Sequence, residues 1–276
     1  MKNKSDFTVL MSVYYKEKPE YLNEALNSIF NQTLLPNQVV IVEDGPLTDE
    51  LDKILLKWKE IHKKIIDLIK LDKNGGLGNA LNEGIKYCKY NYIARMDTDD
   101  ICKKNRFEVQ INFLGRHPDI DILGCNIDEY DENMTKKVSI RMVPETDSKI
   151  KKYLKKRNPM NHPTVIFKKD VVISVKGYDN FLFFEDYYLW TKLANSNCKF
   201  YNIQESLYNF RTSPSMYNRR GGIKYCKYIF IFEKALYKLK IINFCEFICN
   251  ITKRFGGALM PNKIRTYIYS TFYRNK

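Results

Sequence analysis

The sequence lacks the features that mark membrane-spanning and secreted proteins. Its 276 residues contain no apolar run near the ~18 residues that a membrane-spanning helix needs. The N-terminus, MKNKSDFTVLMSV, has no long apolar stretch of the kind found in signal peptides. The seven cysteines are odd in number and form no C-x-x-C pair, which argues against a zinc site and against a disulfide framework. We therefore expect a cytoplasmic protein in a reducing compartment.

Acidic residues are scarce in the C-terminal part of the chain. Residues 217–276 carry thirteen Lys or Arg against only Glu233 and Glu246, so most of the net charge of +14 lies there. The preceding residues are near charge balance, and 44 % hydrophobic residues supply enough material for a core. The length fits one large α/β domain with an appendage, and the basic tail indicates a partner of its own.

Four apolar runs alternate with helical patterns in the first hundred residues. The predicted elements are strands at 7–13, 38–42, 65–71 and 92–96, and helices at 21–30, 48–64 and 79–89. This alternation predicts a parallel sheet with right-handed crossovers, whose ligands bind beyond the carboxyl ends of the strands. Polar clusters follow three of the strands, at 14–17, 43–44 and 97–100, and we expect them to converge on one crevice.

The second half has a mixed α+β pattern. We expect a strand within 119–127, further strands at 163–167 and 207–210, and a helix at 185–194. From Lys224 onward the chain is predicted to be helical and basic.

Three carboxylates stand within four residues at Asp97-Thr98-Asp99-Asp100, directly after an apolar strand. Such carboxylates repel one another unless a cation neutralises them, and oxygen ligands suit Mg²⁺ or Mn²⁺. The alternative is a solvated turn that caps a helix starting near Ile101. The motif is short, so these residues alone leave both interpretations open.

Two further acidic segments allow a functional or a structural interpretation. Asp44 follows a strand, where an acid can accept hydrogen bonds from a base or a ribose, but Asp44-Gly45 is also a common turn pair. Glu185-Asp186 begins a helix after the apolar segment FLFF. An acid there is either a helix cap or a general base whose pKa is raised by burial.

Together these segments resemble the inverting family 2 glycosyltransferases. The matching segments occur in the order and spacing of that family over roughly residues 7 to 222, and they are VLMSVYYKE, SIFNQT, VVIVEDGP, NGGLGNALNEGI, YIARMDTDD, NHPTVIFKK, GYDNFLFFEDYYLW and NFR…RRGG. The resemblance implies the GT-A fold, an α/β, Rossmann-like, mostly parallel sheet flanked by helices. It looks closest to the bacterial enzymes that build surface polysaccharides such as O-antigen and capsule.

The resemblance assigns roles to matching positions. The implied nucleotide-sugar contacts are Ser12, Tyr14, Glu17, Asp44, Asn79, Asn82, Asp97 and Asp99. The implied ligands of Mn²⁺ or Mg²⁺ are Asp99 and Asp100. Asp186 matches the general base and Glu185 its acidic neighbour, whereas His162 matches either a donor or acceptor contact or a structural histidine. Tyr15 replaces the usual Asn and Glu43 the usual Asp of the family, which leaves fine donor contacts open.

The resemblance also implies a reaction and a domain division. We expect metal-dependent, inverting transfer of a sugar from a nucleotide-sugar, with UDP-sugar as the first choice, to a glycan acceptor that is lipid-linked. The predicted catalytic domain spans 1–222, with a nucleotide-sugar-binding half at 1–105 and an acceptor-binding half at 106–222, followed by a basic helical region at 223–276. The sequence leaves the sugar, the linkage and the oligomeric state open.

Two other protein classes compete with this interpretation. A nucleotidyltransferase can share such a sheet, but it usually has a Gly-rich phosphate loop after the first strand, where this chain has Tyr-Tyr-Lys-Glu at 14–17. A non-catalytic nucleotide- or nucleic-acid-binding protein could use the basic C-terminal region. The intact acidic motifs argue against it, and we expect no nucleic acid as a partner.

The charge and apolar pattern of the C-terminal region predict that the protein attaches peripherally to the inner face of the cell membrane. Its basic residues are interleaved with apolar runs at 228–232 and 241–251. A basic amphipathic helix can lie in the membrane interface without spanning it. The alternative is that these helices pack on the catalytic domain with their lysines in water.

Overall fold

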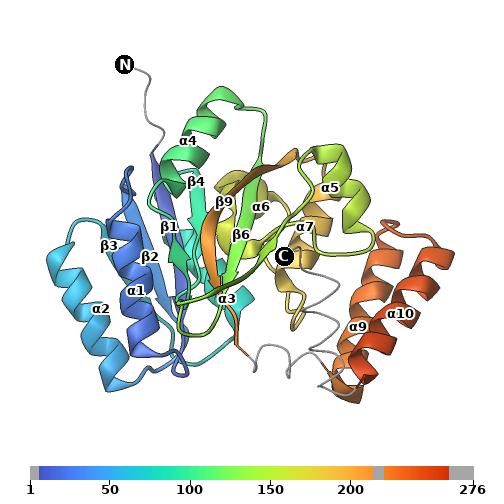
Figure 1. The fold of residues 1–276 in the computed structure, drawn as a ribbon, viewed down its shortest axis with the longest axis horizontal. Coiled ribbons are helices and arrows are strands. Elements are labelled where there is room, and N and C mark those ends of the chain that lie inside the picture. Colours follow the sequence, from blue (N-terminus) through green and yellow to red (C-terminus); the bar gives the residue numbers. More distant parts are fainter. Residues whose placement is uncertain (1–5, 214–220, 261–276) are drawn as a thin grey trace.

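The computed structural model describes residues 6–213 and 221–260, which form a mixed α/β fold (Figure 1). The N-terminal part consists of β1 (Phe7–Val13), α1 (Pro19–Phe30), β2 (Gln38–Glu43), α2 (Asp49–Ile61), β3 (Ile66–Lys70), α3 (Leu77–Tyr87) and β4 (Tyr92–Arg95). β1 pairs with β2 and β4, and β2 pairs with β3, all in parallel. The predicted parallel sheet is therefore confirmed. β1 and β2 are buried almost throughout, as expected for strands covered on both faces.

The second half extends this sheet with strands of both directions. Its elements are β5 (Ile101–Cys102), α4 (Arg106–Arg116), β6 (Ile122–Tyr130), β7 (Lys137–Arg141), α5 (Asp147–Leu154), the 3₁₀ turn η1 (His162–Thr164), β8 (Ile166–Lys168), α6 (Lys169–Ser174), α7 (Glu185–Asn195) and β9 (Phe200–Arg211). β8 runs antiparallel to β4 and to β6, and β6 runs parallel to β9. Over the described residues one nine-stranded sheet results, in the order β3-β2-β1-β4-β8-β6-β9-β5 with β7 beside β6.

Two strands of the second half have other boundaries than predicted. The strand expected at 163–167 begins only at Ile166, because the N–H of Val165 bonds back to the carbonyl of His162 and closes a 3₁₀ turn. The strand expected at 207–210 is the end of β9, which is longer because it pairs along most of β6.

The helix that the capping interpretation placed near Ile101 starts at Arg106 instead. Ile101 and Cys102 form strand β5, which pairs antiparallel with the end of β9. The segment 97–100 therefore leads into a strand, and the capping interpretation of its acidic residues is wrong.

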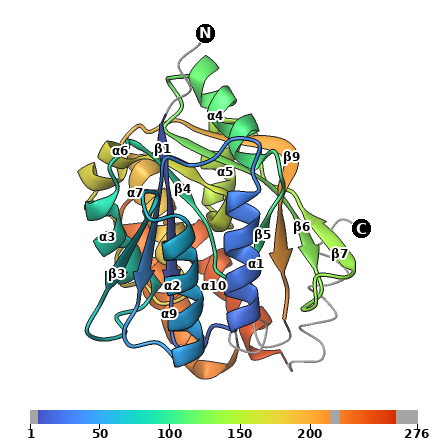
Figure 2. The ribbon, with the colours of Figure 1, turned by 90° about the vertical axis from the view of Figure 1, so that its left-hand side faces the viewer.

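Two C-terminal helices, α9 (Gly222–Lys238) and α10 (Phe244–Leu259), complete the described structure. They lie side by side next to α5 and α7, at the opposite end of the molecule from α1 and α2 (Figure 1). Figure 2 shows α1 and α2 in front of the sheet, where they cover one of its faces. Within 6–213 and 221–260, no helix combines the length and the apolar character that crossing a bilayer requires.

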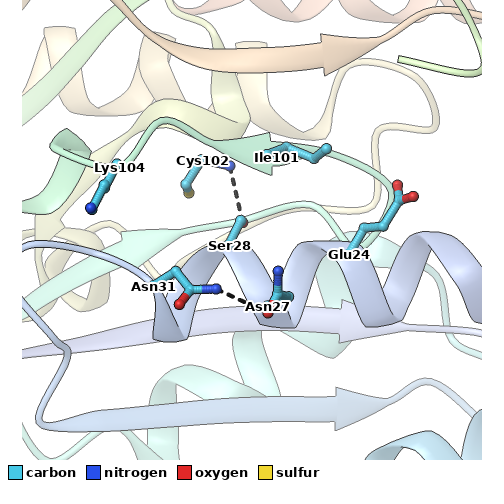
Figure 3. Close-up of a pocket in the computed structure, with 7 residues that line it drawn as sticks. All are labelled: Glu24, Asn27, Ser28, Asn31, Ile101, Cys102 and Lys104. Carbon is cyan, nitrogen blue, oxygen red and sulfur yellow. Dashed lines mark hydrogen bonds between the residues drawn. The ribbon is translucent and has the colours of Figure 1, made fainter. Parts of the chain in front are cut away.

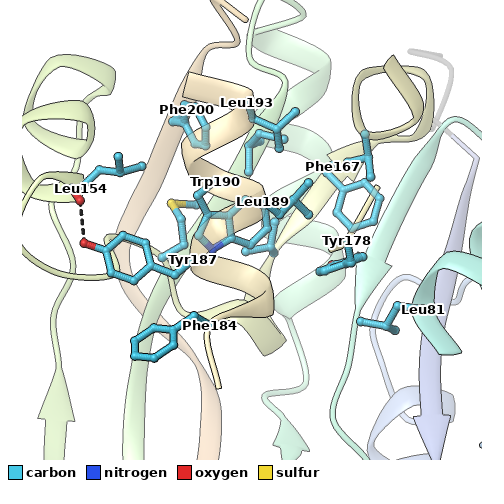
Figure 4. Close-up of a cluster of buried hydrophobic side chains, with 14 of the residues drawn as sticks. Leu81, Leu154, Phe167, Tyr178, Phe184, Tyr187, Leu189, Trp190, Leu193 and Phe200 are labelled. Atoms are coloured by element: carbon cyan, nitrogen blue, oxygen red, sulfur yellow. Dashed lines mark hydrogen bonds between the residues drawn. The ribbon is translucent and has the colours of Figure 1, made fainter. Parts of the chain in front are cut away.

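The inner side of α9 shares a hydrophobic core with α7. Ile229, Phe232 and Leu236 belong to the same buried cluster as Trp190 and Leu193. Figure 4 shows the α7 part of this cluster, in which the Tyr187 hydroxyl donates to the carbonyl of Leu154 at 2.6 Å; further labelled members are Leu81, Phe167, Tyr178, Phe184, Leu189 and Phe200. The C-terminal helices are thus packed against the rest of the chain, and they share a core with α7.

Candidate active site

The carboxylates of Asp97, Asp99 and Asp100 converge just after β4. One oxygen of each lies within 4.8 Å of the others. Buried Arg95 forms an ion pair with Asp97 at 2.5 Å. Arg211, at the end of β9, donates its backbone N–H to Asp100 (2.7 Å) and its Nε–H to the carbonyl of Asp99 (2.7 Å). The cluster is therefore held in place by the ends of β4 and β9.

This cluster brings three acidic groups together, of which Asp100 is buried and Asp97 and Asp99 are half-buried. Burial, Asp97 and Glu17 raise the pKa of Asp99 to about 7, and burial with both neighbouring aspartates raises the pKa of Asp100 well above its ordinary value. Among the described residues, Oδ2 of Asp100 has no partner in hydrogen-bond geometry, although the Tyr208 hydroxyl is close enough to lower its pKa. Clustered carboxylate oxygens with an unsatisfied buried atom fit a divalent ion such as Mg²⁺ or Mn²⁺.

The end of β1 reaches the same cluster. Thr98 donates its hydroxyl to Oε2 of Glu17 at 2.6 Å, and burial raises the pKa of Glu17. Ser12 near the end of β1 is half-buried, and Tyr14 just beyond it is 37 % exposed. The predicted convergence of the β1 and β4 ends is confirmed, whereas the nucleotide contacts of these side chains remain predictions.

Asp44 shapes the loop that leads from β3 into α3. Its buried carboxylate accepts the backbone N–H groups of Gly75 (2.7 Å) and Gly76 (3.0 Å). Gly45 has φ +84°, and a Cβ there would lie 2.5 Å from the backbone N of Asn74, so this position needs glycine. The loop after β2 and the start of α3 are therefore tied together. The predicted contact of Asp44 with a base or ribose stays a prediction.

The two asparagines of α3 differ in their surroundings. Asn79 is exposed in the first helical turn. Asn82 accepts the backbone N–H of Tyr178 (2.8 Å) and donates to the carbonyl of the same residue (2.8 Å). A Cβ at Gly177, which has φ +64°, would clash with Oδ1 of Asn82. Asn82 thus positions Tyr178, and the donor contacts of both asparagines remain predictions.

His162 lies between Arg95 and Tyr178. Its Nε2 is 2.9 Å from the Tyr178 hydroxyl, and its ring centroid is 6.0 Å from that of Trp190. Burial and the positive charge of Arg95 lower the pKa of His162 well below its ordinary value, so the ring is neutral near pH 7. A neutral ring can accept a hydrogen bond from a sugar hydroxyl or act as a structural residue, and both predictions stay open.

The acidic pair Glu185-Asp186 begins α7. Asn158 donates its amide N–H to Oδ2 of Asp186 at 2.6 Å. Glu185 packs near the start of α3, where a Cβ added to Gly78 would lie 3.5 Å from Cγ of Glu185. Asp186 is therefore held by the segment after α5, and Glu185 lies beside the start of α3.

Tyr178 connects the acidic pair to the carboxylate cluster. Burial raises the pKa of Tyr178, the positive charge of Arg95 lowers it in part, and the charges of Asp186 and Asp97 raise it. Both carboxylates therefore lie within electrostatic range of one hydroxyl. The fold therefore brings the start of α7 and the end of β4 into the same region, although 89 positions separate Asp97 from Asp186 in the chain.

Residues 8–188 match the profile of the family described as Glycosyl transferase family 2. The chain belongs to this family. It is 40 % identical over 268 residues to the UDP-Gal:alpha-D-GlcNAc-diphosphoundecaprenol beta-1,3-galactosyltransferase of Escherichia coli, with 97 % of this chain and 96 % of that protein covered. It is 37 % identical over 267 residues to the amylovoran biosynthesis glycosyltransferase AmsE of Erwinia amylovora, with 95 % and 97 % covered. The predicted glycosyltransferase class is therefore confirmed.

The fold agrees with this assignment. The glycosyltransferase is similar to the crystal structure of S. aureus TarS 1-349 in complex with UDP-GlcNAc, with a TM-score of 0.68 and 17 % identity. The likeness covers 98 % of this chain and 76 % of that one. The predicted GT-A fold is confirmed.

Sequence reasoning missed several residues that hold the site of this glycosyltransferase together. Arg211 stands in the NFR segment but had no predicted role. Its Nη2 donates to Glu24 at 2.6 Å, and its guanidinium lies 3.7 Å from the ring centroid of Tyr21. Asn158 had no predicted role either, and only the basic run before it marks its position. The two arginines of the RRGG segment, at 219–220, lie outside the described residues.

A separate open groove lies between α1 and β5 (Figure 3). It is lined by Glu24, Asn27, Ser28, Asn31, Ile101, Cys102 and Lys104. Its polar groups bond to one another: Asn31 donates to Asn27 at 2.9 Å, and the N–H of Cys102 donates to Ser28 at 3.1 Å. None of the predicted donor, metal or catalytic residues lines this groove, so we assign it no part in the reaction.

Proposed function

We propose that this glycosyltransferase moves a sugar from a UDP-sugar to a hydroxyl of a lipid-diphosphate-linked acceptor during polysaccharide synthesis, with inversion at the anomeric carbon. The proposal is supported by the carboxylate cluster at 97–100 and by Asp186, since Asp97 and Asp186 both lie within electrostatic range of the Tyr178 hydroxyl. The first group suits a metal-bound diphosphate, and the second suits an acceptor hydroxyl. The names of the Escherichia coli and Erwinia amylovora relatives support the donor, the acceptor class and the pathway, so UDP-galactose is the first donor to test.

On the donor side, Asp99 and Asp100 would hold Mn²⁺ or Mg²⁺. When bound, such an ion supplies positive charge that stabilises the diphosphate of the departing nucleotide. The proposed contacts with the nucleotide and its sugar are Ser12, Tyr14, Glu17, Asp44, Asn79, Asn82, Asp97 and Asp99. Arg211 and Arg95 act through these acids, because they fix the backbone and side chains of the cluster.

On the acceptor side, Asp186 is the proposed general base. Its carboxylate takes the proton of the acceptor hydroxyl while that oxygen bonds to the anomeric carbon. The bond from this carbon to the β-phosphate oxygen breaks, and its electron pair leaves with UDP. Attack opposite the leaving group inverts the anomeric configuration. The hydrogen bond from Asn158 orients the Asp186 carboxylate for this step.

A donor panel tests the proposal. Thermal shift with UDP-galactose, UDP-glucose, UDP-GlcNAc and GDP-mannose, with and without Mn²⁺, should give a metal-dependent rise in Tm for UDP-sugars. Transfer from the best donor to a GlcNAc-diphosphate-lipid, followed by NMR of the product, should show an inverted linkage. A response to GDP-mannose alone, or a product with retained configuration, would contradict the proposal.

We further propose peripheral attachment to the inner face of the cell membrane through α9 and α10. Their outer face, as we call it, exposes large apolar side chains, namely Ile223, Phe230, Ile231, Tyr237, Phe244, Ile248 and Leu259. The exposed lysines of the same face and its margins are Lys224, Lys227, Lys234, Lys238, Lys240 and Lys253. Apolar surface with positive charge complements an anionic leaflet, which is also where a lipid-linked acceptor resides.

A further inference from the structure

The segment 155–158, Lys-Lys-Arg-Asn, joins the proposed base to the C-terminal helices. At one end, Asn158 donates to Asp186 at 2.6 Å. At the other end, the carbonyls of its first two residues accept hydrogen bonds from Asn250 (2.8 Å) and Arg254 (3.1 Å) of α10. The segment is therefore fixed both at the catalytic base and at α10.

The anchor on α10 is built around a buried acid. Glu233 of α9 is 0 % exposed, and its two carboxylate oxygens lie 2.8 Å from Nε of Arg254 and 3.0 Å from Nδ2 of Asn250. The guanidinium of Arg254 also packs over the rings of Tyr187 and Phe232, at 5.5 and 5.7 Å from their centroids. These contacts make the anchor a rigid platform for the segment 155–158.

Two cations lie in the middle of this fixed segment. Lys156 and Arg157 are exposed, and their Cα atoms are within ~4–8 Å of that of Asn158 by chain geometry. A pair of exposed cations thus stands within two residues of Asn158, which bonds to the proposed base.

Three kinds of surface follow one another from the base outward. Asp186 comes first, then the segment with the cations at 156–157, and then helix α10, which carries part of the apolar and basic outer face. A lipid-linked acceptor has matching parts in the same order: a sugar hydroxyl, two phosphates and a hydrocarbon chain. Phosphate oxygens form strong, charge-assisted hydrogen bonds with Arg and Lys.

We propose that Lys156 and Arg157 bind the diphosphate of the lipid-linked acceptor. This contact places the acceptor sugar at Asp186 and directs its hydrocarbon chain toward the outer face of α9 and α10. The assignment rests on the proposed function and specifies how that site recognises its acceptor class. In this arrangement the contacts of Arg254 with Glu233 and with the carbonyl of Lys156 hold the segment of the two cations in place.

Two soluble acceptors test the assignment: GlcNAc joined to a short alkyl chain through a diphosphate, and the alkyl glycoside without phosphate. The double variant Lys156→Ala/Arg157→Ala should raise KM for the first acceptor about ten- to hundredfold, the range for losing one or two ionic hydrogen bonds. KM for the UDP-sugar and kcat/KM for the phosphate-free acceptor should stay unchanged. Lys149→Ala/Lys152→Ala, which removes equal charge from exposed positions of α5, should behave as wild type.

A binding measurement separates this assignment from the proposed reaction and from general attraction to lipid head groups. An alkyl diphosphate without sugar should bind the wild-type protein and bind the Lys156→Ala/Arg157→Ala variant more weakly by the same factor. If this holds while neither acceptor is glycosylated, the proposed function is wrong and the diphosphate site stands. Equal affinity of both proteins for the alkyl diphosphate, with weaker binding of the variant only to phosphatidylglycerol vesicles, would overturn the assignment. Equal wild-type KM values for the two acceptors would also overturn it.

Discussion

Two buried acids of this glycosyltransferase have contrasting surroundings. Glu233 in α9 and Asp100 after β4 are both 0 % exposed. Glu233 lies 2.8 Å from the guanidinium of Arg254 and 3.0 Å from the amide of Asn250. Asp100 instead stands beside two more carboxylates, and among the described residues no ion pair is formed by its side chain.

This contrast distinguishes an acid that has a structural role from an acid that is proposed to bind a metal ion. Burial raises the pKa of both acids, but Arg254 offsets part of the rise for Glu233, whereas the neighbouring aspartates add to the rise for Asp100. A buried charge with a counter-charge is part of the fold, whereas crowded carboxylates favour a bound proton or a bound cation. We therefore expect the C-terminal helices to have a structural role and the carboxylate cluster to bind a metal ion.

Removing charge from the carboxylate cluster should have the largest effect on activity. We expect Asp99→Asn and Asp100→Asn each to abolish Mn²⁺-dependent UDP binding and sugar transfer, because each removes a proposed metal ligand. The fold should persist, since one of several repelling carboxylates is lost. Calorimetric UDP titration with Mn²⁺, circular dichroism and a radiolabel transfer assay measure the three quantities.

The matched control is the other buried acid. Glu233→Gln should leave the Mn²⁺ and UDP affinities unchanged but lower Tm, because Arg254 loses its buried counter-charge. Mn²⁺-dependent UDP affinity that survives in both aspartate variants would remove the metal assignment. A change of metal affinity in Glu233→Gln would contradict the different roles assigned to Glu233 and Asp100.

The acceptor side can be tested at the start of α7. Asp186→Asn should keep donor binding and reduce kcat by ~10²-fold or more, as for the loss of a general base. Glu185→Gln alters the adjacent acid and should retain most of the activity. Steady-state kinetics with saturating donor distinguish the two. An inactive Glu185→Gln beside an active Asp186→Asn would assign the base to the neighbouring residue.

Local sequence patterns predicted the parallel half and the placement of the acids. The runs FTVLMSV and QVVIV are apolar enough to be buried on both faces, and the acidic segments follow directly at the strand ends. The residues that hold those acids in place could not be predicted, because they lie far away in the sequence. Arg211 bonds to Asp100 across 111 positions, and the two-residue strand β5 exists only through its pairing with β9.

The structure of the C-terminal helices could likewise be predicted only in part from the sequence. Their helical and basic character could be predicted from composition and periodicity. The burial of Glu233 could not, because an acid within a lysine-rich helix is expected in water. It is buried because Asn250 and Arg254 reach it from α10, which depends on how the two helices pack.

Metal affinity should depend on pH near neutrality. Since burial and Asp97 raise the pKa of Asp99 from 3.8 to about 7, a metal ion must displace a proton below that pH. We expect the apparent Mn²⁺ affinity to fall about tenfold per pH unit below pH 7. For the metal-free protein, folded Asp99 binds its proton more tightly than the unfolded chain does. Its contribution to the free energy of unfolding therefore decreases as pH rises from about 4 to 7, and it levels off above.

Mn²⁺ titrations at pH 6, 7 and 8, with urea unfolding of the metal-free protein at the same pH values, check both trends. Asp99→Asn should flatten the pH dependence of stability relative to wild type. Glu83→Gln, a half-buried acid on α3 that pairs with Lys86, should leave it unchanged. A wild-type stability that increases more steeply with pH than that of Asp99→Asn would contradict the assigned protonation.

The smallest expected effect concerns the outer face of α9 and α10. Phe244 and Ile248 are 60 % and 47 % exposed, so Phe244→Glu/Ile248→Glu should leave the core intact. The double variant should bind anionic vesicles several-fold more weakly, because it removes apolar surface and adds negative charge at the proposed membrane contact. Leu56→Glu changes an equally exposed apolar residue on α2, at the other end of the molecule, and should bind as wild type.

Co-sedimentation with phosphatidylglycerol and with phosphatidylcholine vesicles at low and high salt measures this difference. Wild-type binding should favour the anionic vesicles and weaken with salt, because the lysines of the outer face contribute by charge. The kinetics with a soluble acceptor should be equal for the wild type and both variants, because Phe244, Ile248 and Leu56 are not among the proposed site residues. Equal vesicle binding by the three proteins, or no preference for anionic lipid, would mean that α9 and α10 serve only to hold α7 and the segment 155–158.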